Sequence, residues 1–132
     1  MSDEEFPMVG DFRELEHGRA DSPSLRAAVG IEEPPHAREL IRYLRSGAVL
    51  AATAGLTHDV LSADRAIIGG LSLLTDGQWL WYSDLAYYVE HHHVALDPAF
   101  IAHAQSRDWT VPQLGHRDLL AMEAALFDDS AD

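Results

Sequence analysis

The chain has 132 residues, a formal net charge of −13 at neutral pH, 47% hydrophobic residues and no cysteine. This length predicts one domain, and the strong negative charge argues against direct binding to nucleic acid or to an anionic membrane surface. The lack of thiols excludes disulfides, thiolate zinc sites and thiol catalysis, and no apolar run approaches the roughly 20 residues that a membrane-spanning helix needs.

The excess of acidic residues is greatest near the two ends of the sequence. Residues 1–33 hold nine acids and three arginines, residues 34–127 hold ten acids and six arginines, and residues 128–132 hold three acids. We therefore predict an acidic N-terminal arm over 1–33, a single domain over 34–127 and an acidic tail over 128–132.

The N-terminal arm combines acidic and apolar residues. Residues 2–5 (SDEE) lack the positive and apolar stretches of a secretory signal, which predicts a cytoplasmic protein. Phe6, Phe12 and Leu15 are too apolar for an entirely solvated tail. We therefore expect part of the arm to dock on the domain.

Proline and glycine mark the first helices. A short helix is predicted over residues 24–29, with Gly30 following it. Between Pro35 and Gly47, apolar residues recur at helical spacing with three arginines alongside them. This pattern predicts a second helix over residues 35–46.

Short apolar runs then predict a small antiparallel sheet. We expect strands over residues 48–53, 66–74 and 78–82, with a loop over 56–65. Asp76-Gly77 lies between two apolar runs, and this dipeptide favours a two-residue type I′ turn because both central residues need positive φ. The second and third strands should therefore form a tight hairpin.

The predicted turn fixes which residues share a face of the hairpin. It pairs Leu74 with Trp79 and Leu73 with Leu80. The face predicted to pack on the core carries Leu71, Leu73, Leu80 and Tyr82, and the other carries Gly70, Ser72, Leu74, Trp79 and Trp81. The two indoles then either lie beneath a helix or form an exposed aromatic shelf, and burial is the more usual outcome.

Three further helices are predicted after the hairpin. Ser83 is the expected N-cap of the first, and Asp97-Pro98 opens the second over residues 97–107. The run HRDLLAMEAALF predicts the last. The complete prediction is an α+β fold in which a three-stranded antiparallel sheet with one tight hairpin is packed by four to five helices.

The candidate catalytic and metal-binding residues have simpler structural explanations. Adjacent helical residues diverge by about 100°, so His91, His92 and His93 cannot converge on one ion, and we predict neither a metal nor a cofactor. His58-Asp59 with Ser62 has the residue types of a hydrolase triad or of a metal phosphohydrolase pair. No G-x-S-x-G motif frames a serine, and turn chemistry accounts for these loop residues.

A resemblance covers roughly residues 40–112. It is carried by the segments YLRSGAVLAAT, IIGGLSLLTDGQWLWYSDLAYYV and HVALDPAFIAH. These segments resemble small proteins of high-GC bacteria, some of which are similar to immunity proteins of polymorphic toxin systems. The resemblance implies a cytoplasmic protein that binds and neutralises a toxin, and it carries over no active-site residue. An acidic surface would suit a basic toxin.

Three functional hypotheses follow from the sequence. The preferred one is a non-catalytic module that binds another protein, expected to be basic. Its predicted partner-binding residues are the aromatic Trp79, Trp81 and Tyr87 and the acidic Asp76, Asp84 and Glu90. The alternatives are a histidine-using, metal-dependent enzyme, with a pocket joining His91 or His92 to His58 or His103, and a homo-oligomeric assembly subunit.

Overall fold

The computed structural model describes residues 6–127 and confirms the predicted α+β fold. In that range a three-stranded antiparallel sheet is combined with five helices. The elements are α1 (Leu25–Ala28), α2 (Ala37–Arg45), β1 (Ala48–His58), β2 (Ile67–Thr75), β3 (Leu80–Tyr82), α3 (Leu85–His92), α4 (Pro98–Ser106) and α5 (His116–Phe127). The predicted acidic start at residues 2–5 and the acidic tail at 128–132 lie outside the described residues.

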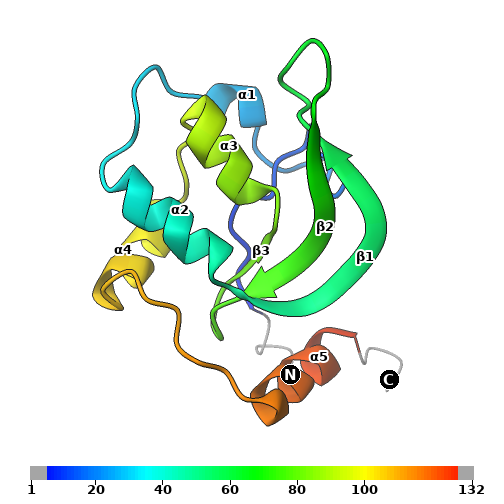
Figure 1. Ribbon diagram of the computed structural model, residues 1–132, viewed down its shortest axis with the longest axis vertical. Helices are drawn as coiled ribbons and strands as arrows, with labels where there is room; N and C mark the ends of the chain where they lie inside the picture. The colour runs from blue at the N-terminus through cyan, green and yellow to red at the C-terminus, as the bar shows by residue number, and fades with distance from the viewer. Residues whose placement is uncertain (1–5, 128–132) are drawn as a thin grey trace.

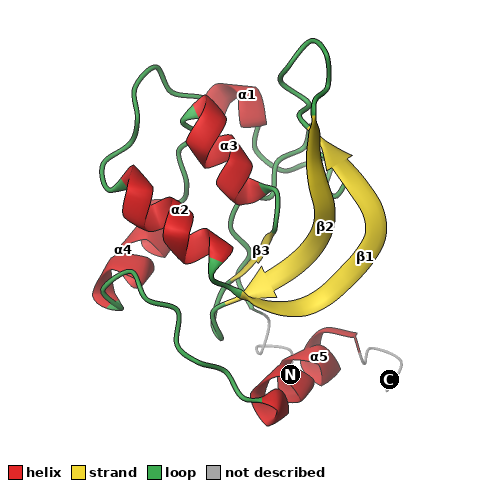
Figure 2. Cartoon of the chain, viewed as in Figure 1, coloured by secondary structure: helices red, strands yellow, loops and turns green. Residues whose placement is uncertain are grey.

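The strands are arranged in the order β1-β2-β3. β1 and β2 form a long curved ribbon, and the short β3 lies beside β2 (Figure 1). Helices α1 to α4 gather on one side of the sheet, whereas α5 lies apart from them near the end of the ribbon where β1 begins (Figure 2). Within the described residues, no helix is both long and apolar enough to cross a bilayer.

β1 is longer than the sequence predicted. Leu56, Thr57 and His58, which we expected in a loop, pair with Gly70, Gly69 and Ile67 of β2. Register shifts interrupt the ladder between Ala52 and Leu56, so the strand continues through an irregular segment that local sequence signals describe poorly.

The hairpin forms where it was predicted, but the predicted pairing of its strands was wrong by two residues. β2 pairs Thr75 with Leu80 and Leu74 with Trp81, so four residues connect the strands instead of two. The Asp76 carboxylate accepts hydrogen bonds from the backbone N–H groups of Gln78 and Trp79, at 2.9 and 2.8 Å. This side chain closes a wider loop than a type I′ turn would. A shift of two residues preserves the alternation of faces.

Both faces of the hairpin are buried where β2 pairs with β3, and the larger core lies on the face that we did not predict. Trp81 is completely buried among the helices together with Leu74, and its indole N–H donates to the Leu44 carbonyl at 2.9 Å. Leu73 and Leu80 belong to a smaller cluster that also holds Leu50 of β1 and Met122 of α5. The predicted core face therefore packs on one helix, while the tryptophan face meets several.

The N-terminal arm covers one edge of the sheet. The Leu80 N–H donates to the Pro7 carbonyl and the Val9 N–H donates to the Leu80 carbonyl, both at 2.9 Å, so the arm runs parallel to β3. Val9, Phe12 and Leu15 are buried in the main core. Within residues 6–127, the opposite edge, formed by β1, has no strand beside it.

The helix caps follow the sequence at one position and depart from it at another. Asp97 accepts a hydrogen bond from the Ala99 N–H at 2.9 Å and Pro98 begins α4, as predicted. Ser83 is not the N-cap of α3, because its hydroxyl bridges the Ser72 N–H and the Gly70 carbonyl across the sheet. Asp84 takes the cap position without a side-chain capping bond, since its carboxylate points elsewhere.

Candidate functional site

The six predicted partner-binding residues do not form one surface. Trp81 and Asp76 are 0% exposed and Asp84 is 1% exposed, so none of the three offers a contact surface in this fold. Trp79 is half-buried and packs against Phe100 in a T-shaped arrangement, with 5.3 Å between the ring centroids. Tyr87 and Glu90, both on α3, are half-buried and exposed respectively.

Asp76 is an internal junction between the hairpin and two helices. Besides the two turn N–H groups, it accepts hydrogen bonds from the Tyr43 hydroxyl and from His103 Nε2, the latter at 2.9 Å. Burial alone would raise the pKa of Asp76, but the donors from Tyr43, Trp79 and Gln78 lower it below its ordinary value. Burial and the neighbouring carboxylate together raise the pKa of Tyr43.

Asp84 has a similar role at the other end of β3. Its Oδ2 accepts a hydrogen bond from the Thr57 hydroxyl at 3.1 Å and lies 2.9 Å from His17 Nε2. The His17 ring also stacks on Tyr82, with 4.1 Å between the ring centroids. Asp84 therefore ties β1 and the N-terminal arm to the start of α3.

Asp59 completes a set of three buried aspartates, each bonded to a histidine. Its carboxylate accepts from the Leu61 N–H and the Tyr87 hydroxyl, both at 2.8 Å, and lies 2.7 Å from His92 Nε2. Burial opposes ionisation of Asp59, yet the bonds from His92, Leu61 and Tyr87 lower its pKa. The hydrogen bond to Asp59 raises the pKa of Tyr87.

These three aspartate–histidine pairs give a structural role to residues that the sequence analysis had considered as functional. Each carboxylate is held by donors from distant elements, which is the arrangement that a buried charge requires. The paired residues are 67, 33 and 27 positions apart, so sequence spacing gave no signal for them. The eight histidines in a strongly acidic chain were the available hint.

The three side chains of the histidine run have different neighbours. His92 bonds Asp59, the His91 ring stacks on Tyr87 at 4.2 Å, and His93 is the left-handed C-cap of α3. Across residues 6–127 no group of three or more histidine, aspartate or glutamate side chains is placed to hold a metal ion.

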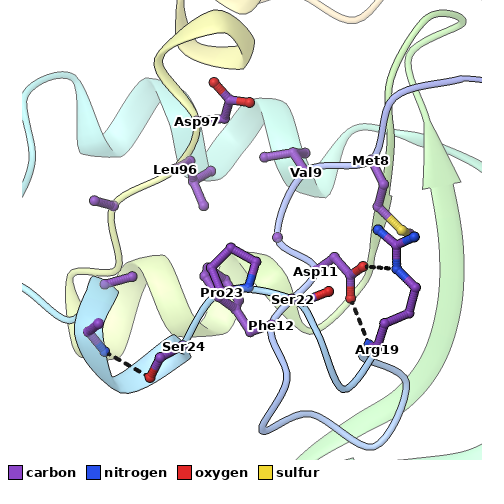
Figure 3. Close-up of a pocket in the computed structure, with 14 residues that line it drawn as sticks. Met8, Val9, Asp11, Phe12, Arg19, Ser22, Pro23, Ser24, Leu96 and Asp97 are labelled. Carbon is purple, nitrogen blue, oxygen red and sulfur yellow. Dashed lines mark hydrogen bonds and ion pairs between the residues drawn. The ribbon is translucent and has the colours of Figure 1, made fainter.

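A cavity of about 500 Å³ lies between the N-terminal arm, α1 and the segment before α4. Figure 3 shows Asp11 joined to Arg19 on the side of the N-terminal arm, with Leu96 on the opposite side of the cavity. The Asp11 carboxylate accepts from the Arg19 side chain at 2.8 Å and from its backbone N–H at 3.2 Å. The polar groups on this side therefore stabilise the arm.

The outer half of the β1–β2 ribbon, which we define as residues 52–58 of β1 and 67–72 of β2, has an accessible apolar surface. Residues 52–56 of β1 are all exposed, and Leu56 and Ile67 are 57% and 64% exposed. The two strands contain no acidic or basic side chain except His58. In the described structure, a Cβ built on Gly69 or on Gly70 would meet no atom within 4 Å.

Comparisons with protein-family models, with curated proteins and with solved structures found no match. The similarity to immunity proteins therefore remains a prediction from the sequence.

Proposed function

We propose that the protein is a non-catalytic binding module that takes a basic protein partner on the outer half of the β1–β2 ribbon. The observation that carries this proposal is an exposed, uncharged ribbon in a chain whose net charge is −13. Apolar surface of this kind is typical of contact sites, and the surrounding charge selects the partner.

The free edge of β1 supplies the polar part of the proposed contact. An unpaired edge presents a row of backbone N–H and C=O groups that an extended segment of a partner can bind. Alanine and glycine dominate residues 51–55, so a partner's backbone can approach closely. Leu56 and Ile67 supply exposed apolar side chains on the same half of the ribbon.

The net charge favours a foreign partner over a second copy. Two copies would each bring a charge of −13, and their repulsion opposes association. A basic protein would instead be attracted over long range and associate faster at low salt. Neutralisation of a basic toxin by an immunity protein is the specific form of this proposal.

The experiment begins with capture of partners from the native cell by the tagged protein, followed by purification of the basic protein that is recovered. Calorimetry then compares the wild type with Leu56→Lys/Ile67→Lys. The matched control is Ile31→Lys/Leu120→Lys, which adds the same two charges at exposed apolar positions outside the ribbon. We expect the ribbon variant to lose about tenfold or more in affinity and the control to lose little.

Two results would contradict the proposal. One is equal affinity of the purified partner for the wild type and for the ribbon variant. The other is a wild-type homodimer, measured by light scattering, that dissociates in the ribbon variant and binds no basic protein. The second result would establish the assembly-subunit hypothesis.

A histidine-using enzyme is the second candidate, and His92 is the observation that favours it. Its side chain is 23% exposed while Asp59 holds Nε2 at 2.7 Å, an arrangement found in general bases. Turnover of model carboxylic and phosphate esters by the wild type, lost in His92→Ala, would support this candidate over the binding module.

A further inference from the structure

The exposed side of α2 carries a groove rich in arginine, which we name the α2 arginine groove. Its volume is about 430 Å³, and it is lined by Glu33, Arg38, Ile41, Arg42, Arg45, Ser46 and Glu90. Three of the nine arginines in the chain therefore line one hollow of an acidic protein.

Helix geometry places these arginines together. Positions 38, 42 and 45 are separated by four and three residues, so their side chains fall within an arc of roughly 60°. Like charges at this spacing repel one another and weaken a helix. Arg42 and Arg45 are in the last turn, where the helix dipole favours cations, but Arg38 is in the first turn, where the dipole disfavours them.

Nearby carboxylates neutralise the positive charge of this arginine cluster only in part. Arg45 Nη2 lies 2.6 Å from Glu90 Oε1, and His91 lies 3.8 Å from the same oxygen. Within residues 6–127, no carboxylate lies within ion-pair distance of Arg38 or Arg42. Both side chains are exposed, so two guanidinium groups are left with their donors available at the groove.

Arg42 is accessible from two sides. It also lines a neighbouring hollow of about 470 Å³, formed with Ser46 and with the segment from Trp109 to Leu114. The Ser46 hydroxyl donates to the backbone carbonyl of Arg42 at 2.7 Å, which occupies that carbonyl and leaves the guanidinium unaffected.

We propose that the α2 arginine groove binds a small multivalent oxyanion, a phosphate- or carboxylate-bearing molecule, through Arg38 and Arg42. The planar guanidinium matches both kinds of oxyanion with paired hydrogen bonds. The net charge of −13, with Glu33 and Glu90 at the groove, repels long polyanions and so restricts the ligand to a small molecule. This site does not depend on the β1–β2 ribbon.

Titration calorimetry with sodium pyrophosphate and, separately, with sodium citrate at matched low ionic strength tests the proposal and distinguishes the two chemistries. The site variant is Arg38→Gln/Arg42→Gln. The control is Arg13→Gln/Arg117→Gln, which removes the same charge from exposed positions elsewhere. We expect saturable binding of at least one anion, weakened about tenfold or more in the site variant and retained in the control.

Backbone amide shifts of the wild type provide a second measurement that does not depend on the variants. The anion that binds should shift the signals of residues 38–46 more than those of the ribbon. The proposal is overturned if neither anion binds saturably, or if both double variants lose affinity equally. Neither result would bear on the binding of a basic protein by the ribbon.

Discussion

Replacement of Asp76 by alanine should destabilise the protein severely. The side chain is completely buried and holds four donors, which are the Tyr43 hydroxyl, the Gln78 and Trp79 N–H groups and His103 Nε2. A buried donor left without an acceptor costs about 1–3 kcal/mol, and Asp76→Ala removes the acceptor of all four donors at once. We therefore expect Asp76→Ala to lose about 3–5 kcal/mol of unfolding free energy.

Urea unfolding followed by tryptophan fluorescence measures this loss. With a slope of about 2 kcal/mol per molar urea, the midpoint should fall by about 2 M. Asp21→Ala, at an exposed aspartate, is the control and should leave the midpoint unchanged. A midpoint for Asp76→Ala close to that of the control would refute the assignment of Asp76 as a structural junction.

A double-mutant cycle identifies the cause of the loss. Tyr43→Phe alone should cost about 1–2 kcal/mol because it removes a buried hydrogen bond. In the Asp76→Ala background the same change should cost almost nothing, since the hydroxyl has already lost its acceptor. Additive effects would show that the two side chains are not coupled, contrary to the structure.

Three further predictions concern acid stability and packing. Because the folded-state pKa values of Asp59 and Asp76 lie below the ordinary value, their stabilising contribution is complete above about pH 4 and is lost as the pH falls through and below that value. Thermal melts between about pH 6 and pH 2.5 should show this loss, and Asp76→Ala should show a smaller one. Gly47→Ala should lose about 1–3 kcal/mol in urea unfolding, because a Cβ at this position would lie 2.7 Å from the Trp81 ring. Gly70→Ala should be neutral or slightly stabilising in the same assay, because the added methyl meets open space, and a loss above about 1 kcal/mol would contradict the open ribbon.

The sequence was most informative where a structural signal is local. Asp97-Pro98 predicted the start of α4 because one carboxylate caps a nearby N–H and proline suits the first helical turn. Asp76-Gly77 located the hairpin, but the type I′ turn was wrong because the preference of a dipeptide does not reveal what its side chain will contact. The buried Asp76 carboxylate determined the longer loop and, through it, the register.

The candidate surfaces were harder to predict than the elements. The arginines alongside the apolar face of the second helix were visible in the sequence, but their unequal pairing depends on where α3 places Glu90. The sequence alone was compatible with Trp81 at an interface. In the structure its indole N–H donates to the Leu44 carbonyl inside the core. The sequence predicted a surface position for Asp84, because its partner His17 is 67 residues away and no local pattern indicates their contact.

Local sequence signals were enough to predict the α+β class, the helices bounded by proline and glycine, the position of the hairpin and the acidic charge. These features depend on backbone preferences and hydrogen bonds within a few residues, and composition sets the charge directly. Local signals did not reveal which carboxylates are buried with histidines, which face of the hairpin holds the main core or which strand edge stays open. Those outcomes depend on packing between distant segments, where the desolvation of a charge or an indole is favourable only if a partner from elsewhere in the chain meets it.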